Sequence, residues 1–359
     1  MKLVSRYLVR HVFLGFLAAA ALLIPLFSTF DFIAELEDVS AQGYRWTQAL
    51  TVVLLRVPRV LVNLSPFIAL LGGIVGLGQL SASQEMTAIR MAGYSVTRIA
   101  LAALAAGAIF SASLAAVDEW VASPLQQRAQ TLKNRALATG LNAEESQGAL
   151  WARRDNEFVR VRNVDAQGQP EGIEIFYYNA DFSLRRYVYA GKATLAAGAT
   201  WILHDARQKE WTGGKESMVT LPVLAWQSLF PGNNLQTLSL PTDSFTVSQL
   251  RQYIAYLQLT AQPAAQYQIA LWQKPARPLL LLAMILLAIP FTFGDPRTPG
   301  MGSRLALGVI VGLLTWIIVQ IVINLGLLLG FNPALTALGP SLLMLIVALW
   351  LVDRVNRRQ

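Results

Sequence analysis

The stretch SASQEMTAIRMAGYSVTR at residues 81–98 separates two long apolar runs and is too short to form a domain. Ser81, followed three residues later by Gln84, predicts a capping box, in which both side chains bind free backbone groups at a helix start. Gly93 predicts the end of that helix, because glycine readily adopts the left-handed backbone that closes one. The stretch therefore predicts a short helix over residues 82–92 between two segments that look membrane-spanning.

An apolar stripe runs along this short helix. At about 100° per residue, Ala82, Met86 and Ile89 share one face, with Glu85 on one edge of the stripe and Arg90 near the other. Such a stripe suits docking into a groove of a soluble protein, where the flanking charges set orientation more than affinity. A helix lying on lipid headgroups is the alternative, and it prefers Lys or Arg flanks. The pattern favours a protein partner.

The composition is that of a membrane protein. Of 359 residues, 54% are hydrophobic and 14% are charged, and the formal net charge is +8. The apolar residues concentrate toward the two ends and leave residues 121–270 with the composition of a soluble domain. A basic chain can bind nucleic acid, yet these basic residues cluster beside apolar runs and not along one polar face. We therefore expect no nucleic-acid partner.

Six apolar stretches are long enough, or nearly so, to cross a bilayer. A crossing helix needs about 20 mostly apolar residues for a hydrocarbon core roughly 30 Å thick. The stretches lie at residues 12–30, 60–80, 99–117, 278–293, 305–330 and 334–352. The first follows basic residues as a secretory signal does, but its apolar run exceeds a signal core, which predicts an uncleaved anchor. The sequence predicts an α-helical membrane protein with six transmembrane helices.

The basic residues predict the direction of these spans, because short loops rich in Lys and Arg stay in the cytoplasm. Such residues precede the first span, lie between spans two and three and spans four and five, and follow span six: Lys2, Arg6, Arg10, Arg90, Arg98, Arg297, Arg304, Arg354, Arg357 and Arg358. All these segments fall on one side of the membrane. We expect both termini in the cytoplasm and the segment between spans three and four in the periplasm.

The central segment has the pattern of a β domain. Helical patterns at residues 123–140 and 246–273 flank short alternating segments that are separated by Gly, Asn, Asp and Pro. Short strands without crossover helices predict an antiparallel sandwich or jelly roll. Its inner side chains either fill an ordinary core or line a groove for acyl chains, and apolar stripes usually pack. We expect an ordinary core that contains Phe158, Ile175, Tyr177, Tyr187, Tyr189, Trp201 and Trp226.

The chain lacks the signatures of an enzyme. It has no cysteine and two histidines, and it contains no phosphate-binding loop, nucleophile elbow or zinc-protease motif. An acidic group after the first span, which is more often a solvated face than a cation site, comprises Asp31, Glu35, Glu37 and Asp38. Asp118 and Glu119 are interpreted as the interfacial end of span three beside Trp120. We expect no catalytic residue, metal or cofactor, so that a partner must supply energy for any transport.

The chain resembles the LptF/LptG permease family of lipopolysaccharide exporters. The resemblance is carried by LLGGIVGLGQLSASQEMTAIRMAGYS at 70–95, DEWVASP at 118–124, GALWARRDNEFVRV at 148–161 and FTFGDPRTPGMGSRLALGVIVG at 291–312. It covers essentially the whole chain and keeps the order of three spans, a central β domain and three spans. The last two stretches look more like the LptG branch than the LptF branch.

The resemblance implies a periplasmic β-jellyroll domain inserted between helices 3 and 4. The expected domains are residues 1–122 with a cytoplasmic coupling helix at 82–92, residues 123–270 and residues 271–359. The implied partners are the LptF sister permease, an LptB ATPase dimer, LptC and the periplasmic bridge LptA. The chain would be the non-catalytic permease subunit of an ABC transporter that extracts lipopolysaccharide from the bacterial inner membrane. Alternatives are the LptF-type role, or a scaffold that relays ATPase motion without passing lipid.

The family's coupling helix implies the first set of site residues. Glu85 matches its acidic residue, which seats in the ATPase, and Met86, Ile89 and Arg90 would lie beside it in the same contact. The position of Glu85 at the edge of the apolar stripe predicts the same task, as a charge that orients a docked partner.

Basic and aromatic residues near the periplasmic side form the second set. Arg56 and Arg59 lie at the start of span two, where a charge costs about 2.5 to 3.5 kcal/mol on insertion scales. A functional partner and snorkelling to the surface explain them equally well, and a basic position in the family motif favours Arg59 as a lipid contact.

Span five carries Trp316, Gln320 and Asn324 on one face. Amides in hydrocarbon need partners, and a helix–helix hydrogen bond is favoured slightly over a lipid contact. The resemblance places spans one and five at a lateral gate, and so implies gate-lining roles for Phe27, Phe30 and Trp316. The lipid-binding candidates are therefore Arg56, Arg59, Phe27, Phe30, Trp316 and Gln320.

Overall fold

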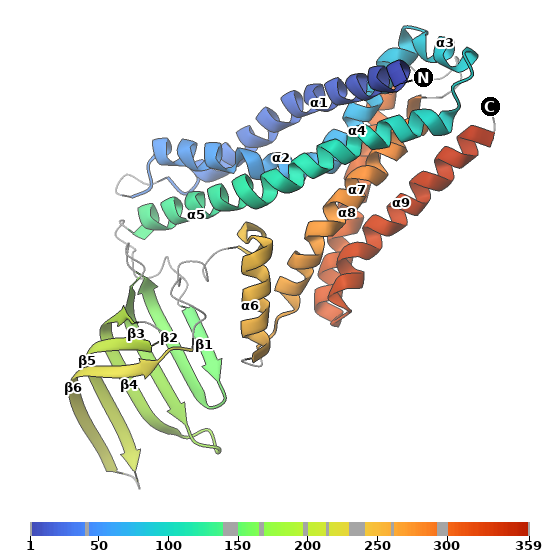
Figure 1. Ribbon diagram of the computed structural model, residues 1–359. Coiled ribbons are helices and arrows are strands. Elements are labelled where there is room, and N and C mark those ends of the chain that lie inside the picture. Colours follow the sequence, from blue (N-terminus) through green and yellow to red (C-terminus); the bar gives the residue numbers. More distant parts are fainter. Residues whose placement is uncertain are drawn as a thin grey trace. The chain divides into compact units, whose positions relative to one another are not determined.

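The computed structural model (Figure 1) describes residues 2–39, 43–138, 150–164, 169–196, 200–212, 215–229, 241–259, 262–292 and 301–357. The chain divides into two compact units. The helical unit comprises Met1–Ala34, Val53–Gln126 and Ala265–Gln359, and the central unit comprises Glu35–Val52 and Gln127–Ala264. The domain limits expected at 122/123 and 270/271 stay predictions. The boundaries of the compact units lie near them, at 126/127 and 264/265.

The described residues contain six helices that are long and apolar enough to cross a membrane, as predicted. They are α1 (Lys2–Leu36), α2 (Trp46–Ala82), α4 (Val96–Val117), α7 (Ala265–Thr292), α8 (Met301–Leu329) and α9 (Pro333–Arg357). Each begins before its predicted apolar stretch, because more polar residues precede the apolar run within the same helix. α4 passes through a π-helical turn, η1 (Asp118–Ala122), directly into α5 (Ser123–Ala138).

α2 is the centre of the helical unit. Of its most apolar window 78% is buried, against 22% for α1 and 17% for α8. Ile68, Leu70, Ile74 and Leu77 on α2 are fully buried in the apolar core. α1 and α8 therefore present broad apolar faces to their surroundings, as helices in contact with lipid or another membrane protein do.

α1 and α2 cross at a contact made of backbone atoms. A side-chain carbon at Gly15 would collide with the carbonyl oxygen of Gly72, one at Gly72 would lie 2.7 Å from the Phe16 nitrogen, and one at Gly76 would lie 2.5 Å from the His11 carbonyl oxygen. These separations are shorter than van der Waals contact, so the crossing requires residues without a side chain. It holds the poorly buried α1 against the best-buried helix.

The start of α1, the end of α9 and the short helix α3 (Glu85–Met91) lie at the same end of the helical unit (Figure 1). This end carries Lys2, Arg6, Arg90, Arg98 and Arg354, residues that predicted a cytoplasmic side. Arg297 and Arg358, which belong to the same prediction, lie outside the described residues. Which side of the membrane this end faces stays a prediction.

The central unit contains an antiparallel sheet, which confirms the predicted β domain. Its strands are β1 (Leu150–Arg154), β2 (Glu157–Val164), β3 (Pro170–Tyr178), β4 (Leu184–Leu195), β5 (Thr200–Thr212) and β6 (Lys215–Gln227). Neighbours in the chain are neighbours in this six-stranded sheet, so the described strands form a meander. α6 (Val247–Leu259) follows the sheet in sequence.

The buried face of the sheet changes phase along β4 and β5. Ala190 is buried and so is Ala193, three residues on, and the same step separates Leu203 from Ala206. Strand side chains alternate with a period of two, so a step of three moves burial to the other set of positions. Asp205, between Leu203 and Ala206, has a left-handed backbone with φ of 52°. The pairing register of β5 with β4 and with β6 is the same before and after Asp205, so no residue is inserted in one strand alone.

The core of the sheet contains part of the predicted aromatic set. Ile175, Trp201 and Trp226 are buried in it, and Tyr177 packs against it. The prediction was wrong for Phe158, Tyr187 and Tyr189, which occupy the other face of the sheet and are partly exposed. Aromatic residues alternate with basic residues on that face, so an aromatic stripe alone did not identify the core.

We predict that Gly72→Val separates α1 from α2. The new side chain would occupy space held by the backbone of Gly15 and Phe16, and overpacking of this kind costs about 1 to 3 kcal/mol or more. Thermal unfolding of the detergent-purified protein should show a lower midpoint. Gly339→Val is the control, because nothing lies within 4 Å of a side-chain carbon at that α9 position. Equal losses in both variants would contradict the close contact.

Candidate functional site

The short helix α3 begins without the predicted capping box. Ser81 is still within α2, and its hydroxyl donates to the carbonyl oxygen of Thr292 at 3.3 Å. Gln84 precedes α3 with a left-handed φ of 64° and makes no side-chain cap. Gly93, just beyond the helix, has φ of 84°, in agreement with its predicted role as a stop. The change of direction at Gln84 separates α3 from α2.

The apolar stripe of α3 faces the helical unit itself. Met86 is 2% exposed and belongs to the apolar core, and Ile89 packs against that core. The expectation that this stripe is offered to a partner is therefore wrong for Met86, because its side chain attaches α3 to the bundle. The exposed side of α3 carries Met91, which is 86% exposed, and Thr87.

A shallow hollow adjoins the exposed side of α3. It is lined by Thr87, Arg90, Met91, Gly93, Ser95 and Asn356. These residues come from α3, the turn after it and the end of α9. A partner that seats here would contact both the short helix and the carboxyl-terminal span.

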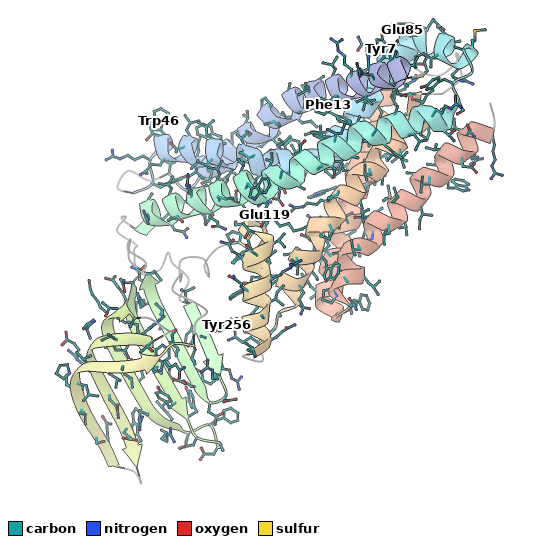
Figure 2. The ribbon with its side chains drawn as sticks, in the orientation of Figure 1. Tyr7, Phe13, Trp46, Glu85, Glu119 and Tyr256 are labelled. Atoms are coloured by element: carbon teal, nitrogen blue, oxygen red, sulfur yellow. The ribbon has the colours of Figure 1, made fainter. Side chains whose placement is uncertain are left out.

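Glu85 is held at the junction of α1 and α3. The Tyr7 hydroxyl donates to its carboxylate at 2.6 Å, and the Ser83 hydroxyl donates to the other oxygen at 3.1 Å. Figure 2 shows Tyr7 and Glu85 together where the start of α1 meets α3. The hydrogen bond from Tyr7, followed by that from Ser83, lowers the pKa of Glu85, so the side chain stays anionic at neutral pH. A second bond, between Ser5 and Tyr94 at 2.9 Å, links α1 to the turn after α3.

A buried charge cluster joins α2, α4 and α7. Asp118, 6% exposed in η1, accepts a 2.6 Å bond from Arg59 of α2 through one oxygen and a 2.7 Å bond from Lys274 of α7 through the other. The Arg277 guanidinium lies 3.8 Å from the same carboxylate, and Arg59 also donates to the Ser123 hydroxyl at 3.1 Å. One carboxylate thus faces several cations in a poorly hydrated place.

This cluster changes the interpretation of two predictions. Arg59 is 3% exposed, so its guanidinium is a partner of Asp118 and does not face a lipid. Asp118 is buried and is no solvated end of span three, while Trp120 nearby is 77% exposed. Sequence reasoning missed Lys274 and Arg277 altogether. The signal was available, since charged residues placed at the start of span four need compensation.

The acidic group after α1 is also more structured than predicted. Within the central unit, Lys133 of α5 lies 2.9 Å from Glu35 and 2.7 Å from Asp38, and the Tyr44 hydroxyl donates to Glu35 at 3.1 Å. Glu35 is 4% exposed, so a solvated face was the wrong interpretation for it. Its oxygens are engaged by a cation and a hydroxyl of the chain.

The remaining lipid-binding candidates lie on exposed helix faces. Phe27 and Phe30 of α1 are 42% and 59% exposed, and their rings make an edge contact with centroids 6.4 Å apart. Trp316 of α8 is 49% exposed, and Gln320, one turn further, is exposed too. Arg56 is partly exposed. The exposed candidates face the surroundings of the helical unit.

The chain is similar to known membrane proteins over almost its whole length. The family model described as lipopolysaccharide export system permease LptF/LptG matches residues 6–354. The chain is similar to the lipopolysaccharide export system permease protein LptG of Escherichia coli (strain K12), with 28% identity over 352 residues and 98% of each chain covered. It is similar to the protein of the same name from Haemophilus influenzae, with 26% identity over 353 residues and 98% of each chain covered.

We predict that Asp118→Asn strongly destabilises the helical unit. Without the negative charge, Arg59, Lys274 and Arg277 repel one another in a poorly hydrated site, and breaking a buried pair costs about 3 to 5 kcal/mol. The free energy of unfolding in mixed micelles measures the loss.

Asp353→Asn is the matched control for this prediction. Asp353 pairs with Arg357 one turn away on α9, but both side chains are more than half exposed, and such pairs contribute about 0.3 to 0.5 kcal/mol. Lys274→Met added to Asp118→Asn should restore part of the lost stability, because it removes one repelling cation. Similar stability of Asp118→Asn and Asp353→Asn would show that the cluster is not needed.

Proposed function

The chain belongs to the LptF/LptG family of lipopolysaccharide export permeases, and from this membership we propose that it is the LptG-type transmembrane subunit of the exporter. In this role it extracts lipopolysaccharide from the bacterial inner membrane and passes it toward a periplasmic bridge. The observation that carries the proposal is the family match over residues 6–354, in a chain whose described residues include six long apolar helices with a β domain between the third and the fourth. The named relatives favour the LptG role over the LptF role.

The proposed energy source is a partner ATPase of the LptB type. Because the sequence lacks a nucleotide-binding loop, the protein itself acts as a non-catalytic subunit. We place the ATPase contact on the exposed side of α3, with Thr87, Arg90 and Met91, and keep Glu85 as the charge that orients it. Met86 and Ile89 support the contact from behind, by packing α3 against the bundle.

The proposed topology puts both termini and α3 in the cytoplasm and the central unit in the periplasm. The basic residues at the α3 end of the helical unit support it. The LptF-type sister permease would pair with the exposed faces of α1 and α8, and LptC and LptA would receive the lipid on the periplasmic side. The low burial of α1 and α8 within this chain supports a membrane partner there.

For the lipid path we propose the exposed side chains Phe27, Phe30, Trp316 and Gln320, with the partly exposed Arg56, which lies within α2 just before the apolar stretch at 60–80. Apolar and amide groups on poorly buried helices suit acyl chains and the head of a lipid that enters between subunits. Arg59 serves this path indirectly, since it positions α2 against Asp118. A relay that moves no lipid is the second candidate, and the exposed face of α8 fits a helix contact equally well.

We predict that Glu85→Ala leaves the permease pair expressed but lowers ATPase co-purification or uncouples ATP hydrolysis from lipopolysaccharide release. The side chain is the anionic group at the α1/α3 junction, so its loss removes both the orienting charge and the Tyr7 bond. Tyr7→Phe should give a milder defect, because it removes the bond and keeps the charge. Release from proteoliposomes and ATP hydrolysis are measured together.

Glu37→Ala is the control for this experiment, since Glu37 is an exposed carboxylate just beyond the other end of α1. Normal co-purification and normal lipopolysaccharide-stimulated hydrolysis by the Glu85→Ala complex would reject the coupling role.

We predict that a photocrosslinking amino acid at Trp316 forms an ATP-dependent adduct with lipopolysaccharide in the assembled complex. Trp316 is 49% exposed on the least buried span, where a passing lipid can reach it. The same probe at Leu343 of α9, which is 61% exposed, should give no ATP-dependent adduct. An active complex without an adduct at Trp316 would favour the relay.

A further inference from the structure

The face of the central sheet opposite the core carries two rows of aromatic and basic side chains. Side chains at paired positions of neighbouring strands lie on the same face. The first row, in strand order, is Trp151, Arg160, Glu174, Tyr189, Arg207 and Thr220. The second row is Arg153, Phe158, Phe176, Tyr187, Lys209 and Met218. We call these two rows the aromatic-basic face.

The aromatic-basic face is not the core face. Between the two rows run Ala152, Val159, Ile175 and Val188, which point the other way and are all buried. Trp151 and Met218, at opposite edges of the sheet, are each 58% exposed. Solvent faces of sheets usually carry small polar or charged residues, and an exposed apolar patch marks a binding surface.

The rings and cations of this face are already arranged for a ligand. The rings of Trp151 and Phe176 are stacked, 18° from parallel with centroids 6.4 Å apart. The Arg160 guanidinium lies 5.6 Å from the Trp151 ring centre, and that of Arg153 lies 4.9 Å from the Phe158 ring centre. Stacked in this way, the guanidinium groups lose little further freedom when they bind.

The charge of the face selects an anion. Glu174 is the single acidic residue of the two rows, and it is 9% exposed and already bound by Arg160 and Arg162. Arg160 pairs with Glu174 and Lys209 pairs with Glu216, while Arg153 and Arg207 are exposed, so basic side chains remain in excess on this face. A planar guanidinium binds phosphate or carboxylate through two parallel hydrogen bonds.

We propose that the aromatic-basic face binds an anionic sugar, the phosphorylated or carboxylated saccharide part of the glycolipid that the permease moves. Flat rings pack against the C–H face of a sugar ring, and neighbouring arginines bind its charged groups. The proposal rests on the proposed function, which supplies such a saccharide. Acyl chains are excluded as the ligand of this face, because nothing in their chemistry matches its cations.

The test uses the complete permease complex in nanodiscs and a fully deacylated, phosphorylated lipopolysaccharide saccharide as the probe. Titration calorimetry should detect binding to the wild type. Trp151→Ala and Arg160→Gln should each weaken it about tenfold, as loss of a cation–aromatic pair or of a charge-assisted bond does. Arg207→Gln, distant from the ring pair and exposed, should weaken it as well while leaving the fold unchanged.

Two controls make the outcome specific. Phe182→Ala removes an aromatic side chain that is 73% exposed in the turn before β4 but outside both rows, and it should bind normally. The dephosphorylated saccharide should bind markedly more weakly than the phosphorylated one. Absent wild-type binding, equal losses in Phe182→Ala and Trp151→Ala, or equal affinity for both saccharides would overturn the proposal.

A measurement of lipopolysaccharide release by the same complex distinguishes failure of this proposal from failure of the proposed exporter function. Release without saccharide binding rejects the aromatic-basic face alone. A complex that binds the saccharide but releases no lipopolysaccharide in the presence of ATP rejects the proposed function.

Discussion

The helical unit depends on one buried carboxylate. Arg59 on α2 and Lys274 and Arg277 on α7 lie at the same level of the bundle, where charges repel strongly because little water screens them. Asp118 reduces that repulsion only if it points inward from α4. The π-helical turn that contains it inserts an extra residue into the helix and so changes which side chains face the bundle. Asp118 can thus be buried while Trp120 remains exposed.

A second set of contacts determines what moves with α1. This helix has few buried side chains and touches α2 through backbone at Gly15 and Gly72. Its start is bound to the α3 region by Tyr7 and Ser5. A displacement of α3 would therefore act on α1 through hydrogen bonds, while the glycine crossing keeps α1 in direct backbone contact with α2. In the proposed exporter, this links the ATPase contact to a helix that faces the lipid path.

The sequence predicts the spans and the β domain well because both depend on patterns local to the chain, the length of an apolar run and the alternation of side chains. It predicts poorly which partner a residue finds. Met86 and Ile89 form an apolar stripe whether that stripe packs on the bundle or on another protein, and Arg59 fits a lipid as well as Asp118. The spacing of residues along the chain does not distinguish these alternatives. Lys274, for example, lies far from Arg59 and Asp118 in the sequence and meets them only in the folded protein. The aromatic-basic face could not be predicted for the same reason, since Trp151 and Arg160 become neighbours only when β1 pairs with β2.

The left-handed backbone at Asp205 limits which substitutions and deletions the sheet tolerates in evolution. Trp201 and Leu203 before it, and Ala206 after it, are all buried although their spacing does not fit simple alternation. Replacing Asp205 by asparagine or glycine preserves this arrangement, because these residues accept a left-handed backbone. Deleting this residue from β5 alone would put one half of the strand out of register by one residue with β4 and β6, and a one-residue slip moves side chains to the other face. Homologues should therefore carry Asp, Asn or Gly at this point, while the length of the strand stays constant.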